Sequence, residues 1–467
     1  MFTLNVFPMK VVIMAGGKGT RIATIKSDVP KPMIPIAGKP ILEWQINCLR
    51  SQGLKDIILV IGYLGHVIKD YFGDGSRFGV NISYFVEDKP LGTAGALFKM
   101  LDNHTDKDLC LDDDFLLMCG DVILDVDFNR FIEFHKEHQA WASLMAHPNG
   151  HPYDSSLLVT QIAYGHTDIT DTTDSLSLAA SAENAEIYPI DTHRVIRWMN
   201  KEDERVYYKN RVNAGIEIIS PELLKHTMAT SPIFNSQFSI SNSKVDLDRD
   251  VLKPNIASGK IFAYDTPEYI KDMGTPDRYY EVEQDIKTGK VKARNLQQKQ
   301  KAVFLDRDGT INKYVGFLTK AEQFELIGGV AETIKRINKS GYLAIVVTNQ
   351  PVIARGECTW EELQEIHNKM ETELGKEGAY VDAIYICPHH PDKGFAGERP
   401  EYKHECNCRK PAPGLLEQAA RDFNIDLSQS IMIGDSESDV KAGENAGCKV
   451  SLKIETDRPM FCLMQLD

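Results

Sequence analysis

The sequence lacks several features that would assign it to a broad class of protein. It has no apolar run long enough to span a bilayer, and residues 1–10 lack the basic start and cleavage site of a signal peptide, so we expect neither a membrane span nor secretion. Positive charge is in deficit, with 53 Lys and Arg against 67 Asp and Glu. An acidic surface is a poor partner for nucleic acid, although basic residues focused in pockets still permit phosphorylated small molecules.

Cysteine is scarce and unevenly placed. Nine cysteines are present, and three of them crowd into one short stretch while the other six are scattered. An odd and uneven set argues against a framework of disulfides and favours a reducing, cytoplasmic compartment with one metal site. The sequence does not determine the oligomeric state, and a homo-oligomer is left open.

The sequence does contain two series of alternating strand and helix patterns, and 467 residues exceed one ordinary core. The first series predicts strands over 11–15, 57–61, 82–86 and 115–119 and helices over 40–50, 65–71, 94–100 and 128–138. The second predicts strands over 302–305, 343–347, 383–386 and 431–434 and helices over 330–338, 361–374, 414–423 and 439–446. Such alternation is typical of a parallel sheet with helices on both faces.

We therefore predict an α/β protein with two doubly wound, Rossmann-like domains. The first covers residues 1–285 and the second covers residues 301–467. The polar and basic stretch 286–300 is the predicted linker. Residues 154–185, which are rich in Ser, Thr, Asp and Ala, are predicted to be in part a surface elaboration.

Two acidic residues follow the first strand of the second domain. Asp306 and Asp308 lie directly after this strand, and chemistry collects at the carboxyl ends of parallel strands. The pair suits covalent phosphoryl transfer, in which Asp306 attacks phosphorus and Asp308 protonates the leaving alcohol and then activates water. The transferred group also needs a cation and positive donors. The remaining candidates come from later segments and are Thr348, Asn349, Arg409, Lys410 and the acidic run 435–439.

With these four ordered motifs, the second domain resembles the haloacid dehalogenase superfamily. The resemblance implies that Asp306 is the nucleophile and Asp308 the acid and base. It implies that Thr348 and Lys410 bind the transferred phosphoryl group. It also implies a Mg²⁺ ion held by Asp306, the carbonyl of Asp308 and Asp435.

Cysteine and histidine cluster in one loop of the second domain. Cys387 and His389 form one close pair, and Cys406 and Cys408 form another. Three thiolates and one imidazole suit tetrahedral Zn²⁺, and four protein ligands leave no open position, so the metal is predicted to be structural. His390 is an alternative to His389 on spacing alone.

The loop and its closing Cys-Arg-Lys-Pro sequence are similar to those of D-glycero-D-manno-heptose 1,7-bisphosphate phosphatases and of histidinol-phosphate phosphatases. The loop alone does not decide between these two families. The resemblance favours His389 as the ligand and adds Asn349, Arg355 and Arg409 as substrate-binding residues. The sequence departs from the family at 351–352, where Pro-Val replaces a usual Ser-Gly turn, and this bears on loop shape and substrate preference.

Glycine-rich and basic segments recur in the first domain. Glycines let backbone N–H groups approach phosphates, and a basic side chain adds charge. A lone glycine-rich loop is weak evidence, but here several segments occur together. They comprise the loop of Gly16, Gly17, Gly19, Thr20 and Arg21, the proline-flanked Lys31, the second loop of Gly92, Thr93 and Gly95, and the aspartates Asp121 and Asp272.

Over about residues 10–285 this pattern resembles the sugar-1-phosphate nucleotidyltransferases. The resemblance implies that Arg21 and Lys31 are catalytic and bind the triphosphate and the attacking sugar phosphate. It implies that Asp121 and Asp272 hold Mg²⁺. A sugar 1-phosphate would attack the α-phosphorus in line and release pyrophosphate, so positioning and charge neutralisation would carry catalysis.

Both glycine loops are predicted to bind substrate, and Asn213 and Gly215 match a sugar-contact turn of the family. One departure is visible in the segment 198–201, where relatives commonly have a Glu-Lys pair. The glutamate is absent and Lys201 is retained.

The two predicted reactions share an intermediate, because a heptose bisphosphate phosphatase yields the heptose 1-phosphate that a nucleotidyltransferase consumes. The first domain looks closest to the heptose-1-phosphate guanylyltransferases, which implies GTP as donor, GDP-heptose as product and, by analogy, the α anomer. We therefore hypothesise a bifunctional enzyme that acts on heptose 1,7-bisphosphate, heptose 1-phosphate and GTP. The rivals are a mannose- or glucose-1-phosphate nucleotidyltransferase fused to a histidinol-type phosphatase and, in another class, a regulatory nucleotide-sugar-binding protein.

Overall fold

The computed structural model describes residues 9–17, 29–101, 105–166, 187–234 and 244–459. The chain divides by its contacts into two compact units. The first unit is made of 1–147, 193–198 and 213–295, and the second of 148–192, 199–212 and 296–467. Within the described ranges, no helix has the length and apolar character needed to cross a membrane.

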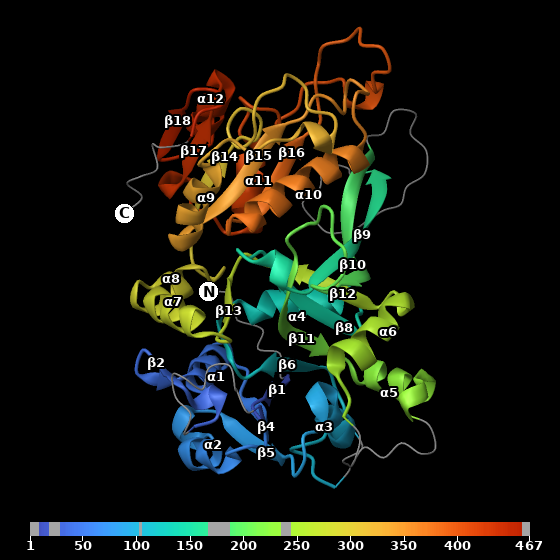
Figure 1. The fold of residues 1–467 in the computed structure, drawn as a ribbon, viewed down its shortest axis with the longest axis vertical. Coiled ribbons are helices and arrows are strands. Elements are labelled where there is room, and N and C mark those ends of the chain that lie inside the picture. Colours follow the sequence, from blue (N-terminus) through green and yellow to red (C-terminus); the bar gives the residue numbers. More distant parts are fainter. Residues whose placement is uncertain (1–8, 18–28, 102–104, 167–186, 235–243, 460–467) are drawn as a thin grey trace. The chain divides into compact units, whose positions relative to one another are not determined.

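The first unit is built on a mixed sheet, which has nine strands in the described part of the chain (Figure 1). The strand order is β5-β4-β1-β6-β11-β8-β12-β10-β9. β1 pairs in parallel with both β4 and β6, whereas β11 runs antiparallel to β6. The bounds are β1 Lys10–Met14, β4 Asp56–Ile61, β5 Asn81–Val86, β6 Phe115–Cys119, β8 Ala142–His147, β9 Leu157–His166, β10 Ile187–Met199, β11 Val212–Ile219 and β12 Ile261–Asp265. β9 and the first residues of β10 count with the second unit.

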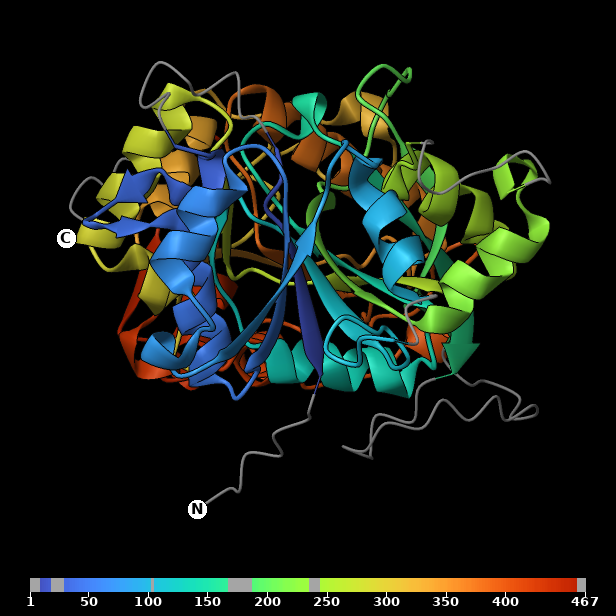
Figure 2. The ribbon, with the colours of Figure 1, turned by 90° about the horizontal axis from the view of Figure 1, so that it is seen from below.

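Helices cover both faces of this sheet, as the alternation predicts. Val11 and Ile13 of β1 share one apolar core with helices α1, α2 and α4. Val12, which alternates with them, points to the opposite face. Figure 2 shows α3, in light blue, across the strands from the blue helices α1 and α2. The helices are α1 Ile41–Ser51, α2 Gly65–Phe72, α3 Gly92–Leu101, α4 Phe128–Glu137, α5 Pro221–Thr230 and α6 Lys253–Asn255. Two short strands, β2 Pro35–Ile36 and β3 Lys39–Pro40, pair with each other.

The predicted linker 286–300 is not an extended connection over most of its length. Helix α7 runs from Pro276 to Lys287, α8 spans Lys290–Ala293, and the first unit ends at Asn295. Val291 of α8 is buried in the same core as Val282 of α7. This apolar contact, which the polar composition of the stretch concealed, attaches residues 286–295 to the first unit.

The second unit has a parallel sheet, which contains five strands among the residues described, in the order β16-β15-β14-β17-β18. The strands are β14 Lys301–Leu305, β15 Tyr342–Asn349, β16 Ala383–Cys387, β17 Ile431–Gly434 and β18 Val450–Lys453. The helices are α9 Val330–Lys339, α10 Trp360–Lys376, α11 Gly414–Asp422 and α12 Glu437–Asn445. One core joins α9 and α10 to the side of β14 that carries Val303, and another joins α11 and α12 to the side that carries Phe304.

All strands and helices predicted in the two alternating series are confirmed within two residues at either end. A single boundary near residue 285 does not separate the two units, because the second unit also contains residues 148–192 and 199–212. Parts of this upstream stretch bind helix α10. The amide of Asn210 donates to Glu371 (2.6 Å), and the amide of Tyr208 donates to Thr372 Oγ1 (3.0 Å). Of the predicted elaboration 154–185, residues 157–166 form β9, while 167–186 lie outside the described residues.

Candidate active sites and metal centre

The second unit places a buried ion pair at the carboxyl end of its central strand. Asp306 follows β14, and its amide donates to the carbonyl of Ile433 (3.0 Å). Lys410 Nζ lies 2.8 Å from Asp306 Oδ1 and 2.6 Å from Asp439 Oδ1. Burial raises the pKa of the Asp306 carboxyl, and the charge of Lys410 opposes this rise. The arrangement presents a carboxylate whose charge is held by one fixed cation, as a nucleophile toward phosphorus requires.

The second acid, Asp308, is held by a different set of donors. Arg307 is fully buried and donates to both oxygens of Asp308 (2.9 and 2.8 Å). Gln350 and Asn312 donate to the same carboxylate (2.9 and 3.0 Å). Burial alone would raise the pKa of Asp308, but Arg307 and the two amides outweigh it and hold the pKa below its usual value. Asp308 is therefore ionised at neutral pH, which suits a base that activates water.

Three carboxylates meet where a cation is expected. Ligand oxygens of Asp306, Asp435 and Asp439 all lie within 4.8 Å of one another, and an all-oxygen donor set suits Mg²⁺. The side chain of Asp308 is not part of this group, and the resemblance assigns only its carbonyl. The sequence placed Asp439 in the candidate acidic run 435–439 but assigned it no role; it lies in the first turn of α12, four residues after Asp435.

The other predicted phosphatase residues fall into two places. Thr348 Oγ1 accepts from Gln350 (2.8 Å), which also donates to Asp308, and Asn349 exchanges two hydrogen bonds with the backbone of Lys410 (3.0 and 3.1 Å). Thr348 is thereby linked to Asp308, and Asn349 to Lys410. Arg355 lies apart, with its guanidinium 4.1 Å from the ring centre of Phe317 and 4.4 Å from that of Phe395. Arg409 donates to the carbonyl of His389 (3.1 Å), at the cysteine loop.

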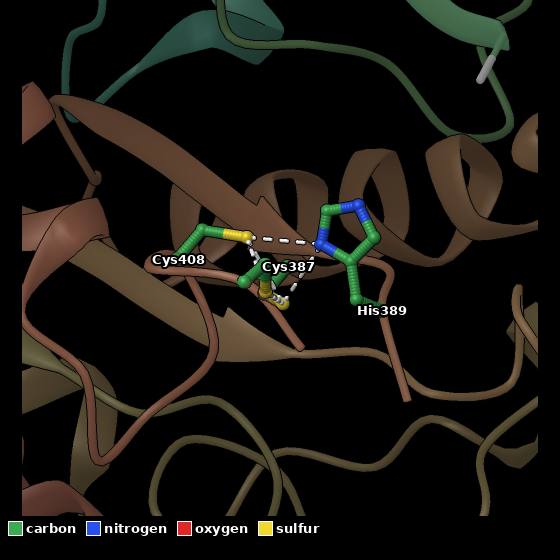
Figure 3. Close-up of side chains that lie close together, drawn as sticks. Cys387, His389 and Cys408 are labelled. Carbon is green, nitrogen blue, oxygen red and sulfur yellow. Dashed lines mark hydrogen bonds between the residues drawn. The ribbon is translucent and has the colours of Figure 1, made fainter. Parts of the chain in front are cut away.

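The cysteine loop brings its four predicted ligands together, and Figure 3 labels three of them, Cys387, His389 and Cys408. His389 Nδ1 lies 3.1 Å from Cys408 Sγ and 3.6 Å from Cys387 Sγ, and the three sulfurs lie 3.1–3.6 Å apart. Tetrahedral Zn²⁺ with bonds of about 2.3 Å to sulfur needs separations of roughly 3.8 Å, so a small expansion accommodates the ion. His390 is not part of the group; its Nδ1 accepts from the amide of Asp392 (3.2 Å).

The first unit brings Lys31, Asp121 and Asp272 together. Lys31 pairs with Asp121, which directly precedes β7 (Val122–Asp125). Asp272 ends β13 (Tyr269–Asp272), which runs antiparallel to β7, and the amide of Met273 donates to the carbonyl of Asp121 (3.0 Å). Arg278, which the sequence did not single out, contacts Asp272 (2.6 Å). Burial would raise the pKa of Asp272, but the charge of Arg278 outweighs it and lowers this pKa.

The predicted substrate loops are described in part. Gly16 and Gly17 follow β1, whereas Gly19, Thr20 and Arg21 lie outside the described residues. Gly92 has φ +84°, and a Cβ there would overlap the carbonyl of Val245, so glycine is required where α3 begins. Thr93 Oγ1 accepts a hydrogen bond from the amide of Leu247 (2.7 Å), and Gly95 is buried in α3. Asn213 Oδ1 accepts a hydrogen bond from the amide of Gly215 (3.4 Å).

Sequence reasoning missed two acids of the first unit, the buried Glu217 and the half-buried Asp248. Burial, then the charge of Asp248, raises the pKa of Glu217 on β11 well above its usual value. Burial likewise raises the pKa of Asp248 to about 6. Their pattern gave no signal, because Glu217 stands inside an apolar strand. Lys201 stands where relatives have the lysine of a Glu-Lys pair. Its side chain is exposed, and its Nζ lies 3.7 Å from Oδ1 of Asp154.

Two family models match different parts of the chain. A family model described as Nucleotidyl transferase matches residues 10–154, and one described as HAD-hydrolase-like matches residues 407–453. The solved structure of HddC from Yersinia pseudotuberculosis is 23% identical with a TM-score of 0.44, covering 60% of this chain and 99% of that chain.

Among curated proteins, a D-glycero-beta-D-manno-heptose-1,7-bisphosphate 7-phosphatase of Haemophilus influenzae is 40% identical over 161 residues, which cover 34% of this chain and 84% of the relative. The corresponding alpha-anomer phosphatase of Photorhabdus laumondii is 41% identical over 161 residues, which cover 34% of this chain and 86% of the relative. The chain is an enzyme that joins a nucleotidyltransferase domain to a phosphatase domain, and over about a third of its length it belongs to the heptose-1,7-bisphosphate 7-phosphatase family.

Proposed function

We propose that the chain makes a nucleotide-activated heptose in two steps. It removes the 7-phosphate of D-glycero-D-manno-heptose 1,7-bisphosphate, and it transfers GMP from GTP to the resulting heptose 1-phosphate. The observation that carries the proposal is the union, in one chain, of a phosphatase related to heptose bisphosphate 7-phosphatases and a nucleotidyl transferase domain. The product of the first reaction is the class of substrate that the second requires.

In the first step Asp306 attacks the 7-phosphorus, the bond from phosphorus to the sugar oxygen breaks, and an aspartyl phosphate forms. Lys410 neutralises the phosphoryl oxygens, and Asn349, which is hydrogen-bonded to the backbone of Lys410, and Thr348 bind them. Asp308, ionised in the free enzyme, takes up a proton from solvent as the negatively charged phosphate binds beside it, and gives this proton to the leaving alkoxide. Once ionised again, Asp308 takes a proton from the water that cleaves the aspartyl phosphate.

In the second step Lys31 holds the reacting phosphates. Because it is paired with Asp121 and lies near Asp272, its ammonium is fixed where the attacking sugar phosphate and the α-phosphorus must meet. An oxygen of the sugar 1-phosphate forms the new bond to the α-phosphorus, and pyrophosphate leaves. No residue needs to form a covalent intermediate, so orientation and charge neutralisation account for catalysis.

We assign Mg²⁺ to Asp121 and Asp272 in the first unit and to Asp306 and Asp435 in the second. Bound there, it would neutralise developing charge on the phosphoryl oxygens. We assign structural Zn²⁺ to the four-ligand group of the cysteine loop. Thiolate ligands must stay reduced, which supports a cytoplasmic enzyme.

The test is a coupled assay on the full chain with Mg²⁺. Purified protein given the bisphosphate and GTP should release phosphate and pyrophosphate and form GDP-heptose, detected by mass spectrometry. Both anomers are assayed, because curated relatives of either anomer are equally similar. GTP is compared with ATP, UTP, CTP and dTTP. Absence of phosphate release, or release from histidinol phosphate alone, would refute the phosphatase assignment, and preference for another nucleotide would refute the guanylyl assignment.

A further inference from the structure

The metal-binding histidine has a partner from far upstream in the sequence. The hydroxyl of Tyr188, in β10, lies 2.7 Å from Nε2 of His389. The other ring nitrogen, Nδ1, faces the sulfurs of Cys387 and Cys408 (Figure 3). Tyr188 precedes all the phosphatase motifs, yet it belongs to the second unit with them.

The chemistry of a ligating histidine gives this contact its direction. A metal bound through Nδ1 leaves the ring proton on Nε2, so His389 then donates a hydrogen bond to the hydroxyl oxygen of Tyr188. His389 is only 1% exposed, so water has little access to replace the Tyr188 hydroxyl as the acceptor of this hydrogen bond. A partner on the second nitrogen fixes the tautomer and the ring orientation of a metal ligand.

The ring of Tyr188 is itself held in place. Its centre lies 5.9 Å from that of Tyr402 and 6.2 Å from that of Trp360. Trp360 Nε1 donates to the hydroxyl of Tyr402 (3.2 Å), which ties these two rings together. Because its ring packs against side chains at the start of α10 and in the cysteine loop, the hydroxyl of Tyr188 is directed at His389.

We propose that Tyr188 is a positioning residue of the metal centre. By accepting the Nε2 proton of His389, a residue from the upstream half of the chain completes the surroundings of the zinc ligands of the phosphatase. The consequence is that the phosphatase motifs from residue 301 onward do not contain the whole metal centre. The inference rests on zinc occupying the four-ligand group, which is part of the proposed function.

The experiment compares zinc retention in full-length variants. Tyr188→Phe removes the acceptor and keeps the ring. Tyr164→Phe is the matched control, because Tyr164 lies on the same upstream stretch and its hydroxyl binds Glu361 rather than a metal ligand. Zinc content is measured first by elemental analysis, and transfer of zinc to a chromogenic chelator is then followed in time. Melting temperatures of the metal-free proteins report on packing alone.

We expect Tyr188→Phe to bind zinc about tenfold more weakly and release it correspondingly faster than the wild type. Tyr164→Phe should match the wild type, and the metal-free wild type and Tyr188→Phe should melt together. Equal retention in Tyr188→Phe and wild type would overturn the proposal, as would equal loss in both variants or a lower melting temperature of metal-free Tyr188→Phe. A wild type that binds no zinc would refute the zinc assignment and this inference together, while the coupled assay tests the two reactions separately.

Discussion

The ammonium of Lys410 lies 2.8 Å from Oδ1 of Asp306, and almost no water reaches it. Burial works to lower the pKa of Lys410, but Asp306 and Asp439 outweigh burial and raise it. Lys410 therefore stays charged and opposes the rise that burial causes in the pKa of Asp306. The carbonyl of Val347 accepts a further hydrogen bond from the same ammonium (2.8 Å), which fixes its position.

Lys410→Met should reduce phosphate release from the bisphosphate by at least about a hundredfold, because the phosphoryl oxygens lose a preorganised cation. Asp306→Asn should abolish release altogether. Pyrophosphate release from heptose 1-phosphate and GTP, measured on the same preparations, serves as the internal control and should stay at the wild-type rate. Loss of both activities in either variant would contradict two separate active sites.

In the first unit, Lys31→Met should reduce pyrophosphate release by about a hundredfold and leave phosphate release unchanged, since it removes the cation paired with Asp121. Lys39→Met is the matched control, because Lys39 is a nearby, half-exposed lysine that pairs with Glu43 (3.3 Å). Pyrophosphate is measured enzymatically at saturating GTP. Equal losses in the two variants would show that Lys31 acts only through the local fold.

Both alternating series and the ordered motifs were predictable because they depend on local information. Apolar periodicity marks each buried strand, and the carboxyl end of a parallel strand marks where Asp306 and Asp121 must stand. The two close ligand pairs of the cysteine loop are likewise visible in the sequence. These features identify the residues that react or bind metal. The structure adds the side chains that hold those residues in position.

Partners that are distant in the sequence were not predictable. Tyr188 and His389 meet only because part of the upstream half folds with the second unit, and no local pattern records this. The buried Arg307 looked like an ordinary charged residue beside the nucleophile, because burial is not visible in composition. Residues 286–295 were misassigned for the same reason: one buried valine, Val291, outweighs a polar neighbourhood.

Gly309→Ala should damage magnesium binding in the second unit. Gly309 has φ +78°, and a Cβ there would overlap Oδ2 of Asp435, so the variant adds left-handed strain of about 1–2 kcal/mol and displaces a cation ligand. We expect phosphate release to require about tenfold more Mg²⁺, measured by titration. Gly328→Ala is the control, since a Cβ there meets nothing within 4 Å. An unchanged Mg²⁺ requirement would remove Asp435 from the proposed ligand set.

The buried histidine beside Arg307 predicts a pH dependence of stability. His367 Nε2 lies 3.1 Å from Nη1 of Arg307, which can only donate, so the imidazole is a neutral acceptor. Burial, and then the charge of Arg307, lowers the pKa of His367 to about 3. In the unfolded chain an ordinary histidine has a pKa of about 6.5.

Between pH 6.5 and pH 3 the unfolded chain therefore binds a proton that the folded chain excludes, so the free energy of unfolding falls as the pH falls through this window. At about 1.4 kcal/mol per pH unit, His367 costs about 2 kcal/mol at pH 5 relative to neutral pH. His367→Gln keeps an acceptor for Arg307 and does not titrate. Urea unfolding at pH 7 and pH 5 should show a smaller loss of stability in this variant, by about 2 kcal/mol. Equal losses in the two proteins would mean that His367 is protonated in the folded state, and Arg307 would then lack the neutral acceptor that directs it toward Asp308.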